Sequence, residues 1–257
     1  MKVVMMGAGN LATQLSIALV NSAVPVVQVW SRSRLSASTL AERIGCDWIT
    51  DIGKIDKGAD IYIVAVTDSA IQPFVESCSF GDKLVVHTAG SVPIDILANH
   101  CSNYGVFYPL QTFSKERDID FRNIPICLEA NSEANLTKLR ELAICLSDDV
   151  REINSRQRKQ IHLAAVFVCN FVNHLYAIGE RLVDDKQMDF SILKPLIAET
   201  ASKATHFSPQ TVQTGPAIRN NIAVMQSHIE MLAGYPGFQE IYRIISNDIY
   251  LTHNKLQ

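Results

Sequence analysis

Three polar side chains with catalytic chemistry stand among apolar or small residues. His87 ends the apolar run 83–87, while His162 and Asn170 lie in a long apolar stretch later in the chain. An imidazole can donate a proton near neutral pH, and a carboxamide can orient a bound group through hydrogen bonds. We therefore predict His87 and His162 as proton donors and Asn170 as an orienting residue. The alternative for His87 is a histidine that only hydrogen-bonds within the core.

A glycine turn at residues 7–12 predicts the kind of ligand beside which these proton donors act. Apolar residues Val3–Met6 lead into Gly7-Ala-Gly9-Asn-Leu-Ala12, and a helical pattern follows. The first glycine permits a tight turn, the second lets the backbone approach phosphate, and the alanine allows close packing of helix on strand. The helix N-terminus then directs free N–H groups at an anion. The pattern predicts a dinucleotide diphosphate site, with an ordinary strand–helix turn as the alternative. Its predicted binding residues are Gly7, Gly9, Asn10, Leu11 and Ala12.

The end of the second apolar run bears on which dinucleotide is bound. Run 24–30 is followed by Ser31-Arg32-Ser33-Arg34, which begins 22 residues after Gly9 and has no carboxylate before Glu42. NAD sites usually carry an acidic residue here, which accepts a hydrogen bond from the ribose 2′-OH. Hydroxyl and guanidinium groups suit a 2′-phosphate instead, because arginine binds phosphate through charge-assisted donors. These four residues, Ser31, Arg32, Ser33 and Arg34, therefore predict NADP as the cofactor, with a solvated basic turn as the alternative.

Three further loops follow apolar runs, and ligands bind beyond the carboxyl ends of parallel strands. In the first two loops the predicted cofactor-binding residues are Val66, Thr67, Asp68, Thr88 and Ala89. Helix capping is the alternative role for Asp68. The third loop is the aromatic turn 107–113, where we predict that Gln111 walls a substrate pocket. A proline-anchored loop that covers the sheet is the alternative there.

The second half of the chain carries further polar residues at helical spacing. His162, Val166, Asn170 and Asn173 share one face of an ideal α-helix. Polar groups on so apolar a helix need partners, so they face either an interdomain cleft or another helix. Later, segment 214–221 joins a glycine turn to Arg219, which we predict to bind a substrate carboxylate. An ordinary helix–helix connection is the alternative for that segment.

Strand-like and helix-like segments alternate over the first 150 residues. The expected strands are 3–6, 24–30, 48–50, 60–66, 83–87, 104–108 and 126–128, with helices at 36–44, 69–77, 93–100 and 132–145. Beyond residue 155 the pattern is helical only, at 156–183, 191–207, 223–233 and 238–252. This order predicts an α/β fold with a doubly wound, mostly parallel Rossmann sheet over residues 1–153. An all-helical domain over 154–257 follows it.

Composition narrows the classes of partner and compartment. The 257 residues are 47% apolar and 19% charged, which suits one or two domains with a buried core. A net charge of −3 argues against nucleic acid or an anionic membrane as partner. The six cysteines stand singly, as in a reduced cytoplasmic protein with no metal site. No uninterrupted apolar run reaches the roughly 18–20 residues of a membrane span, so no membrane partner is expected.

Together these motifs resemble the Rossmann-type NADP oxidoreductases related to pyrroline-5-carboxylate reductase and the deazaflavin-dependent NADP reductases. The closest resemblance is to the bacterial subset whose helical C-terminal half is a domain of unassigned function. The resemblance rests on residues 7–12, 65–68, 87–91, 108–113, 162–170 and 214–219. It implies NADP binding, reductase chemistry and a homodimer formed through the helical domain. The related β-hydroxyacid dehydrogenases place a lysine one helical turn before the asparagine, whereas Val166-Phe167-Val168 precedes Asn170 here.

Two functional hypotheses follow from these residues and from the resemblance. The first is an oxidoreductase that moves a hydride between NADPH and a small carbonyl or imine substrate in the interdomain cleft. In that case the cofactor brings the hydride, and the protein brings position and a proton donor. The second is a non-catalytic NADP-binding sensor or regulatory protein, which the missing lysine supports. Measured turnover on a panel of small substrates separates the two hypotheses.

Overall fold

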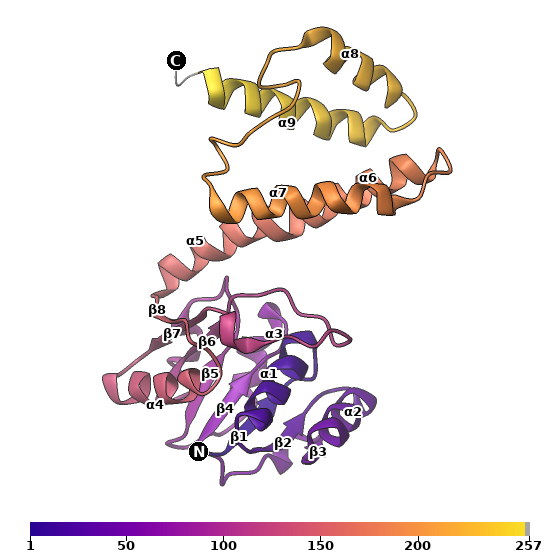
Figure 1. The fold of residues 1–257 in the computed structure, drawn as a ribbon. Helices are drawn as coiled ribbons and strands as arrows, with labels where there is room; N and C mark the ends of the chain where they lie inside the picture. The colour runs from indigo at the N-terminus through magenta and orange to yellow at the C-terminus, as the bar shows by residue number, and fades with distance from the viewer. Residues whose placement is uncertain (255–257) are drawn as a thin grey trace. The chain divides into compact units, whose positions relative to one another are not determined.

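The computed structural model describes residues 1–254, which divide between two compact units, the first over Met1–Asn170 and the second from Phe171 onward (Figure 1). The division lies 17 residues beyond the one predicted at 153/154, because the first turns of the long helix that begins at Ser155 are anchored on the sheet of the first unit. The predicted α/β architecture with a helical C-terminal region is confirmed.

One eight-stranded sheet organises the first unit, in the order β3-β2-β1-β4-β5-β6-β7-β8. Neighbouring strands are parallel except β6 and β7, which are antiparallel. The strands are β1 Val3–Met6, β2 Val26–Trp30, β3 Asp47–Ile49, β4 Ile61–Val64, β5 Leu84–His87, β6 Asn103–Pro109, β7 Ile126–Ala130 and β8 Val150–Glu152. Strand order reverses between β1 and β4, and this switch point is where open α/β sheets bind ligands.

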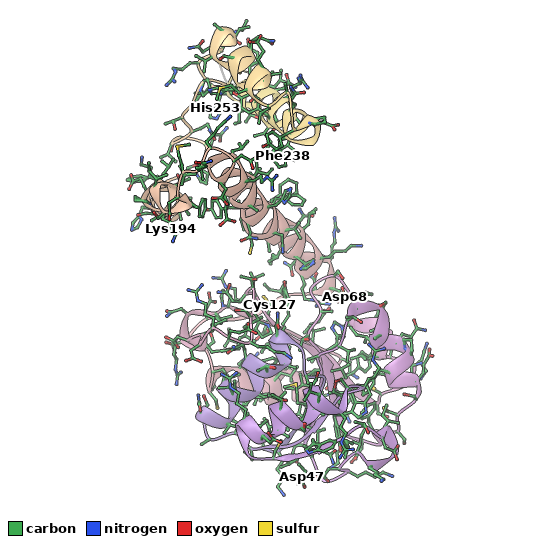
Figure 2. The ribbon with its side chains drawn as sticks, turned by 90° about the vertical axis from the view of Figure 1, so that its right-hand side faces the viewer. Asp47, Asp68, Cys127, Lys194, Phe238 and His253 are labelled. Atoms are coloured by element: carbon green, nitrogen blue, oxygen red, sulfur yellow. The ribbon has the colours of Figure 1, made fainter. Side chains whose placement is uncertain are left out.

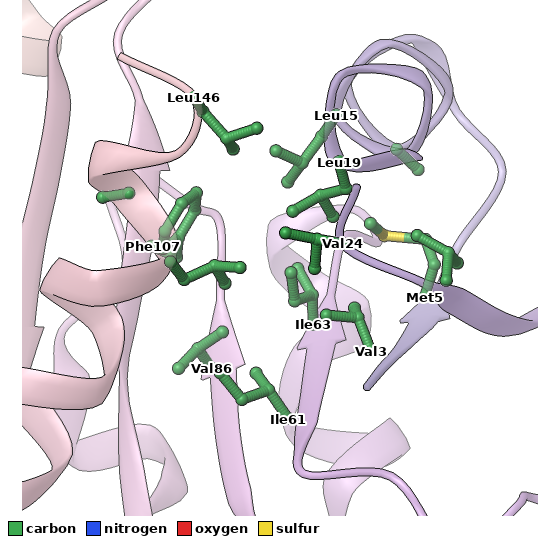
Figure 3. Close-up of a cluster of buried hydrophobic side chains, with 14 of the residues drawn as sticks. Val3, Met5, Leu15, Leu19, Val24, Ile61, Ile63, Val86, Phe107 and Leu146 are labelled. Atoms are coloured by element: carbon green, nitrogen blue, oxygen red, sulfur yellow. The ribbon is translucent and has the colours of Figure 1, made fainter. Parts of the chain in front are cut away.

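Helices cover both faces of this sheet, which explains why its central strands β1, β4 and β5 are buried at every position. These helices are α1 Asn10–Asn21, α2 Arg34–Ile44, α3 Asp68–Glu76 and α4 Glu133–Ile144, and α5 Ser155–Ala165 begins after the last strand. Alternate residues of β1 and β4 (Val3, Met5, Ile61 and Ile63) pack with Leu15 and Leu19 of α1, as Figure 3 shows. The intervening strand residues pack with α3 on the opposite face. Period-2 alternation thus builds two cores.

Two expected elements differ from the structure. The helix predicted over 93–100 is only a short 3₁₀ turn, Ile94–Leu97, which buries a single side chain, Leu97. Strand β8 was missed, since its three residues Val-Arg-Glu carry no apolar run. Its pairing with β7 places it at the edge of the sheet.

The second unit contains helices and little core. It holds α6 Val172–Asp184, α7 Lys194–His206, α8 Ile222–Met231 and α9 Pro236–Asn254, and no strand among the described residues. Its side chains are drawn in Figure 2 together with those of the first unit. Only Ala217 and Leu232 are buried apolar residues in the described part of this unit. Large apolar side chains such as Ile192, Leu196 and Ile244 are exposed.

The helical stretch Ser155–Asp184 is long and apolar enough, by length and composition, to cross a membrane. Its most apolar window has a mean hydropathy of 1.6, and none of that window is buried. The expectation counted only uninterrupted apolar residues, whereas this measure averages hydropathy over a window. One such helix is weak evidence for a membrane span, and the absence of a membrane partner stays a prediction.

Candidate functional site

A cavity of about 870 Å³ opens at the carboxyl ends of the parallel strands in the first unit. The glycine turn follows β1, Ser31 and Arg32 follow β2, and residues 65–68 follow β4. Thr88, Ala89 and Gly90 follow β5, whereas Tyr108, Gln111, Lys115 and His162 come from later segments. Most of the predicted cofactor-binding residues therefore line one space.

The two glycines of the turn serve different purposes. Gly7 has φ +132°, and a Cβ there would lie 2.1 Å from the carbonyl oxygen of Ala65, so no other residue fits. Gly9 has no atom within 4 Å of the position of its missing Cβ, which leaves open cavity space beside the backbone. Gly9 is also the N-cap of α1 and offers no side-chain cap. The first-turn N–H groups are therefore free for an anion such as a diphosphate.

The four residues of the basic segment 31–34, which follows β2, make different contacts. Ser31 and Arg32 line the cavity. Ser33 caps α2 by accepting a hydrogen bond from the backbone N–H of Ser36 at 3.2 Å. The guanidinium of Arg34 lies over the Trp48 ring, 5.5 Å from its centre. One arginine and one hydroxyl thus remain for a 2′-phosphate, and the donor set of the cavity fits NADP.

Lys115 is a cavity residue that the sequence analysis missed. It lies in the loop between β6 and β7, in no recognisable motif. The buried Gln14 of α1 holds this loop, because its Nε2 donates to the carbonyl oxygens of Ser114 at 2.7 Å and Arg117 at 2.9 Å. A buried amide within an apolar helix face was the one signal available, since such a group must find partners.

The opposite end of the cavity holds a tyrosine–histidine pair. Tyr108 Oη and His162 Nδ1 lie 3.2 Å apart. A Cβ at Gly90 would lie 2.6 Å from His162 Nδ1 and 2.8 Å from Tyr108 Cζ, so the missing side chain makes room for both rings. The sequence analysis named His162 but gave Tyr108 no role. Burial, above all, raises the pKa of Tyr108 to about 12, so its phenol keeps its proton at neutral pH.

A buried ion pair fixes the helix that carries His162. Arg158 lies one turn earlier on α5, is 1% exposed and pairs with Glu129 of β7. Its second nitrogen donates to the carbonyl oxygen of Val92 at 2.6 Å. Ser155 donates to Glu129 through its N–H at 2.8 Å and through its hydroxyl at 2.7 Å. These contacts tie α5 to the sheet and so fix the position of His162.

Asp68 also borders the cavity, at the start of α3. Its carboxylate accepts a hydrogen bond from the Ser91 hydroxyl, and α3 has no side-chain cap. The alternative role in capping therefore does not account for it. Val66, Thr67, Thr88 and Ala89 line the same stretch of wall.

His87 does not line this cavity. Its ring is fully buried, and Nδ1 accepts a hydrogen bond from the backbone N–H of Ala89 at 3.2 Å. Burial first, and then Arg158, lower its pKa to about 4, so the ring is neutral near pH 7. These contacts match the alternative of a core histidine more closely than they match a proton donor.

Two other predicted residues lie elsewhere in the chain. Asn170 is exposed within a π-helix, Val166–Phe171, and is not among the residues that line the cavity. The wider π turn departs from the α-helical spacing on which the shared face of His162, Asn170 and Asn173 was predicted. Arg219 is exposed in the loop between α7 and α8 of the second unit. The roles of Asn170 and Arg219 stay predictions.

Comparisons with known proteins place these features among relatives. Residues 124–249 match the family described as a domain of unknown function, DUF2520. A solved structure named as a "putative NADP oxidoreductase" from Bacteroides fragilis is 43% identical, with a TM-score of 0.92 and 97% of each chain covered. A protein from Thermotoga maritima is 22% identical (TM-score 0.77, 95% of this chain and 97% of that chain).

More distant structures share the fold. An imine reductase from Myxococcus stipitatus, solved in complex with NADP+, is 16% identical, with a TM-score of 0.64 and coverage of 99% of this chain and 93% of that chain. Among proteins with curated functions, none matches this sequence.

Proposed function

The chain belongs to the Rossmann-type NADP oxidoreductases that carry a helical C-terminal domain of unassigned function, and from this premise we propose that it reduces a small imine or carbonyl substrate with NADPH. One observation carries the proposal. A single cavity joins the glycine turn at one end to the Tyr108–His162 pair at the other. When bound, NADPH supplies the hydride, and the protein supplies position and a proton.

NADP is the cofactor, and the residues that would hold it are the turn 7–12 together with Ser31 and Arg32. Turn N–H groups bind the diphosphate, and Arg32 binds the 2′-phosphate that distinguishes NADP from NAD. Arg32 makes no hydrogen bond or ion pair with another described residue, so its donors are available. Ser33 and Arg34 support this end indirectly, by starting α2 and by contacting Trp48.

The Tyr108–His162 pair handles the proton. Tyr108 Oη holds a proton at neutral pH because burial raises its pKa to about 12. It can donate that proton toward the cavity and take one from His162 Nδ1, 3.2 Å away, while the other nitrogen of the His162 ring takes a proton from water. His87 is set aside as the donor, since it is buried behind the cavity wall. Of the two histidines predicted as proton donors, only His162 therefore takes part in the proposal, together with Tyr108.

The charge on the cavity wall favours an imine over a carbonyl. The Asp68 carboxylate lines the cavity and forms no ion pair with another described residue. A protonated imine is positive, and a nearby carboxylate stabilises it. A carbonyl develops negative charge on oxygen during reduction, which the same carboxylate opposes. We therefore infer that the substrate is a small imine, with Gln111 of the cavity wall among its contacts.

The decisive experiment follows NADPH oxidation against matched pairs of cyclic imines and ketones, with aldehydes and 2-keto acids beside them. The expected result is turnover on imines that falls at least tenfold in Tyr108→Phe and in His162→Ala while NADP+ still binds. Turnover on ketones alone would overturn the substrate inference. Tight NADP+ binding with no turnover on any substrate would favour the alternative, a sensor or regulatory protein.

A homodimer is part of the proposal. The second unit buries only two apolar side chains among its described residues, which is too little to stabilise it by itself. Exposed apolar residues on α6, α7 and α9, among them Leu175, Leu196 and Ile245, offer a surface for a second copy. Light scattering after gel filtration tests this, and a monomer at micromolar concentration would contradict it. The cytoplasmic location and a substrate position between the two units stay predictions.

A further inference from the structure

Lys115 lies in the irregular first part of the loop between β6 and β7, before the 3₁₀ turn Phe121–Asn123, yet this part of the loop is firmly held. Gln14 of α1 donates to two of its carbonyl oxygens, and Arg43 of α2 donates to the carbonyl oxygen of Lys115 itself at 3.1 Å. Two helices thus fix the backbone of one loop residue. A fixed backbone positions a side chain for binding at a smaller cost in conformational entropy.

The Lys115 side chain is half-buried in the wall of the cofactor cavity. The carboxylate of Asp118 pairs instead with Arg43, at 3.6 Å, and is fully exposed. No ion pair involves Lys115 among the described residues, so its ammonium is available to a ligand. A lysine ammonium acts as a compact point charge for phosphate.

The anchors of the loop decide which phosphate it serves. Gln14 lies one turn beyond Asn10 on α1, so the loop is held beside the N-terminal turns where a diphosphate binds. Arg43 lies at the far end of α2 from Arg34, nine residues or about 13 Å along the helix axis. Lys115 is therefore anchored from the end of α2 opposite to the one that Arg32 precedes.

We propose that Lys115 binds the diphosphate of the cofactor, on a loop that Gln14 holds in place. The proposal rests on NADP binding in this cavity and goes beyond it by assigning a second, independent cation. Arg32 recognises the 2′-phosphate and sets the choice of NADP over NAD. Lys115 adds affinity for either dinucleotide, without choosing between them.

Calorimetry with four probes separates the two cations: NADP+, NAD+, ADP and adenosine 2′-monophosphate. We expect Lys115→Ala to weaken NADP+, NAD+ and ADP by the same factor, about tenfold, and to leave adenosine 2′-monophosphate unchanged. Arg32→Ala should weaken NADP+ and adenosine 2′-monophosphate only. The two factors should multiply in the double variant, because separate sites are additive. Equal loss on all four probes, or no loss on ADP, would overturn the proposal.

Arg117→Ala is the matched control, because Arg117 lies in the same loop and its side chain does not line the cavity. It should bind all four probes like the wild type. Gln14→Met should reproduce the pattern of Lys115→Ala and should speed tryptic cleavage after Lys115 and Arg117. If the wild type binds no NADP+, the proposed function fails. If it binds NADP+ but Lys115→Ala has no effect on ADP, only this inference fails.

Discussion

The two ends of the cavity are built by different means. At the cofactor end, called the backbone end below, the proposed site consists of backbone groups and missing side chains, and one short segment, residues 7–12, provides them. At the opposite end, called the packed end below, Tyr108 and His162 come from segments 54 residues apart. They meet because Arg158 fixes α5 to the sheet. A site made from backbone groups leaves a short motif that can be recognised in the sequence. A site made by the packing of distant segments can be recognised only in three dimensions.

The largest effect is expected at the backbone end, from Gly7→Val. A Cβ there would overlap the carbonyl oxygen of Ala65, 2.1 Å away, at φ +132°. The strained backbone alone costs about 1–3 kcal/mol, and the overlap adds to it. We expect NADP+ binding to fall below detection and the melting temperature to drop.

Gly45→Ala is the matched control for that substitution. Gly45 also has a positive φ, +72°, but has no atom within 4 Å of a Cβ. It ends α2 as a left-handed cap, so alanine should cost about 1 kcal/mol and leave NADP+ affinity unchanged. Equal effects of the two substitutions would show that backbone strain, and not the approach to β4, makes Gly7 necessary.

At the packed end the largest effect is expected from Glu129→Gln. Arg158 is 1% exposed, so removing its partner leaves a buried charge without a counter-ion. Breaking such a pair typically costs about 3–5 kcal/mol. Urea unfolding measures the loss, and turnover should fall with it because α5 loses its anchor. Glu152→Gln, which breaks the exposed pair with Arg140, is the control and should change neither.

The same contrast explains how much of the molecule could be predicted. Apolar runs and turn residues predicted seven of the eight strands, since burial on both faces leaves a strong pattern. Gly7, Gly9 and Arg32 were predicted from their spacing, and all three line the cavity. Tyr108 and Lys115 were not predicted, because their roles depend on contacts with His162 and Gln14 that are distant in sequence. The π-helix at Val166–Phe171 was also beyond an argument that assumes α-helical spacing.

His87 is buried in the core, and its titration predicts how stability depends on pH. Its pKa is lowered to about 4 in the folded protein, against about 6.5 when unfolded. Below about pH 6.5 the unfolded chain binds the extra proton, so stability falls as the pH drops toward 4, by at most about 3 kcal/mol. Above that range the ring is neutral in both states and contributes no pH dependence.

His87→Gln should therefore flatten the stability profile between about pH 4 and 6.5, measured by urea unfolding at several pH values. Glutamine can still accept a hydrogen bond from the Ala89 N–H. Turnover near pH 7 should stay close to that of the wild type. A large loss of turnover, with stability unchanged, would restore His87 as a proton donor and shift the packed end of the site.

The smallest expected effect separates proton transfer from binding at the packed end. Tyr108→Phe removes the phenol but keeps the ring against Gly90, and His162→Ala removes its partner 3.2 Å away. Each should lower turnover at least tenfold, about 1.4 kcal/mol of barrier, because both groups act on the same proton. NADP+ affinity should stay within about twofold, since neither residue belongs to the glycine turn or the basic segment. The double variant should be no slower than the worse single variant, as expected for two groups that act as a unit. If the losses of turnover in the two single variants multiply in the double variant, the tyrosine and the histidine act separately. The packed end would then hold two independent functions, whereas the contact between the two side chains indicates one.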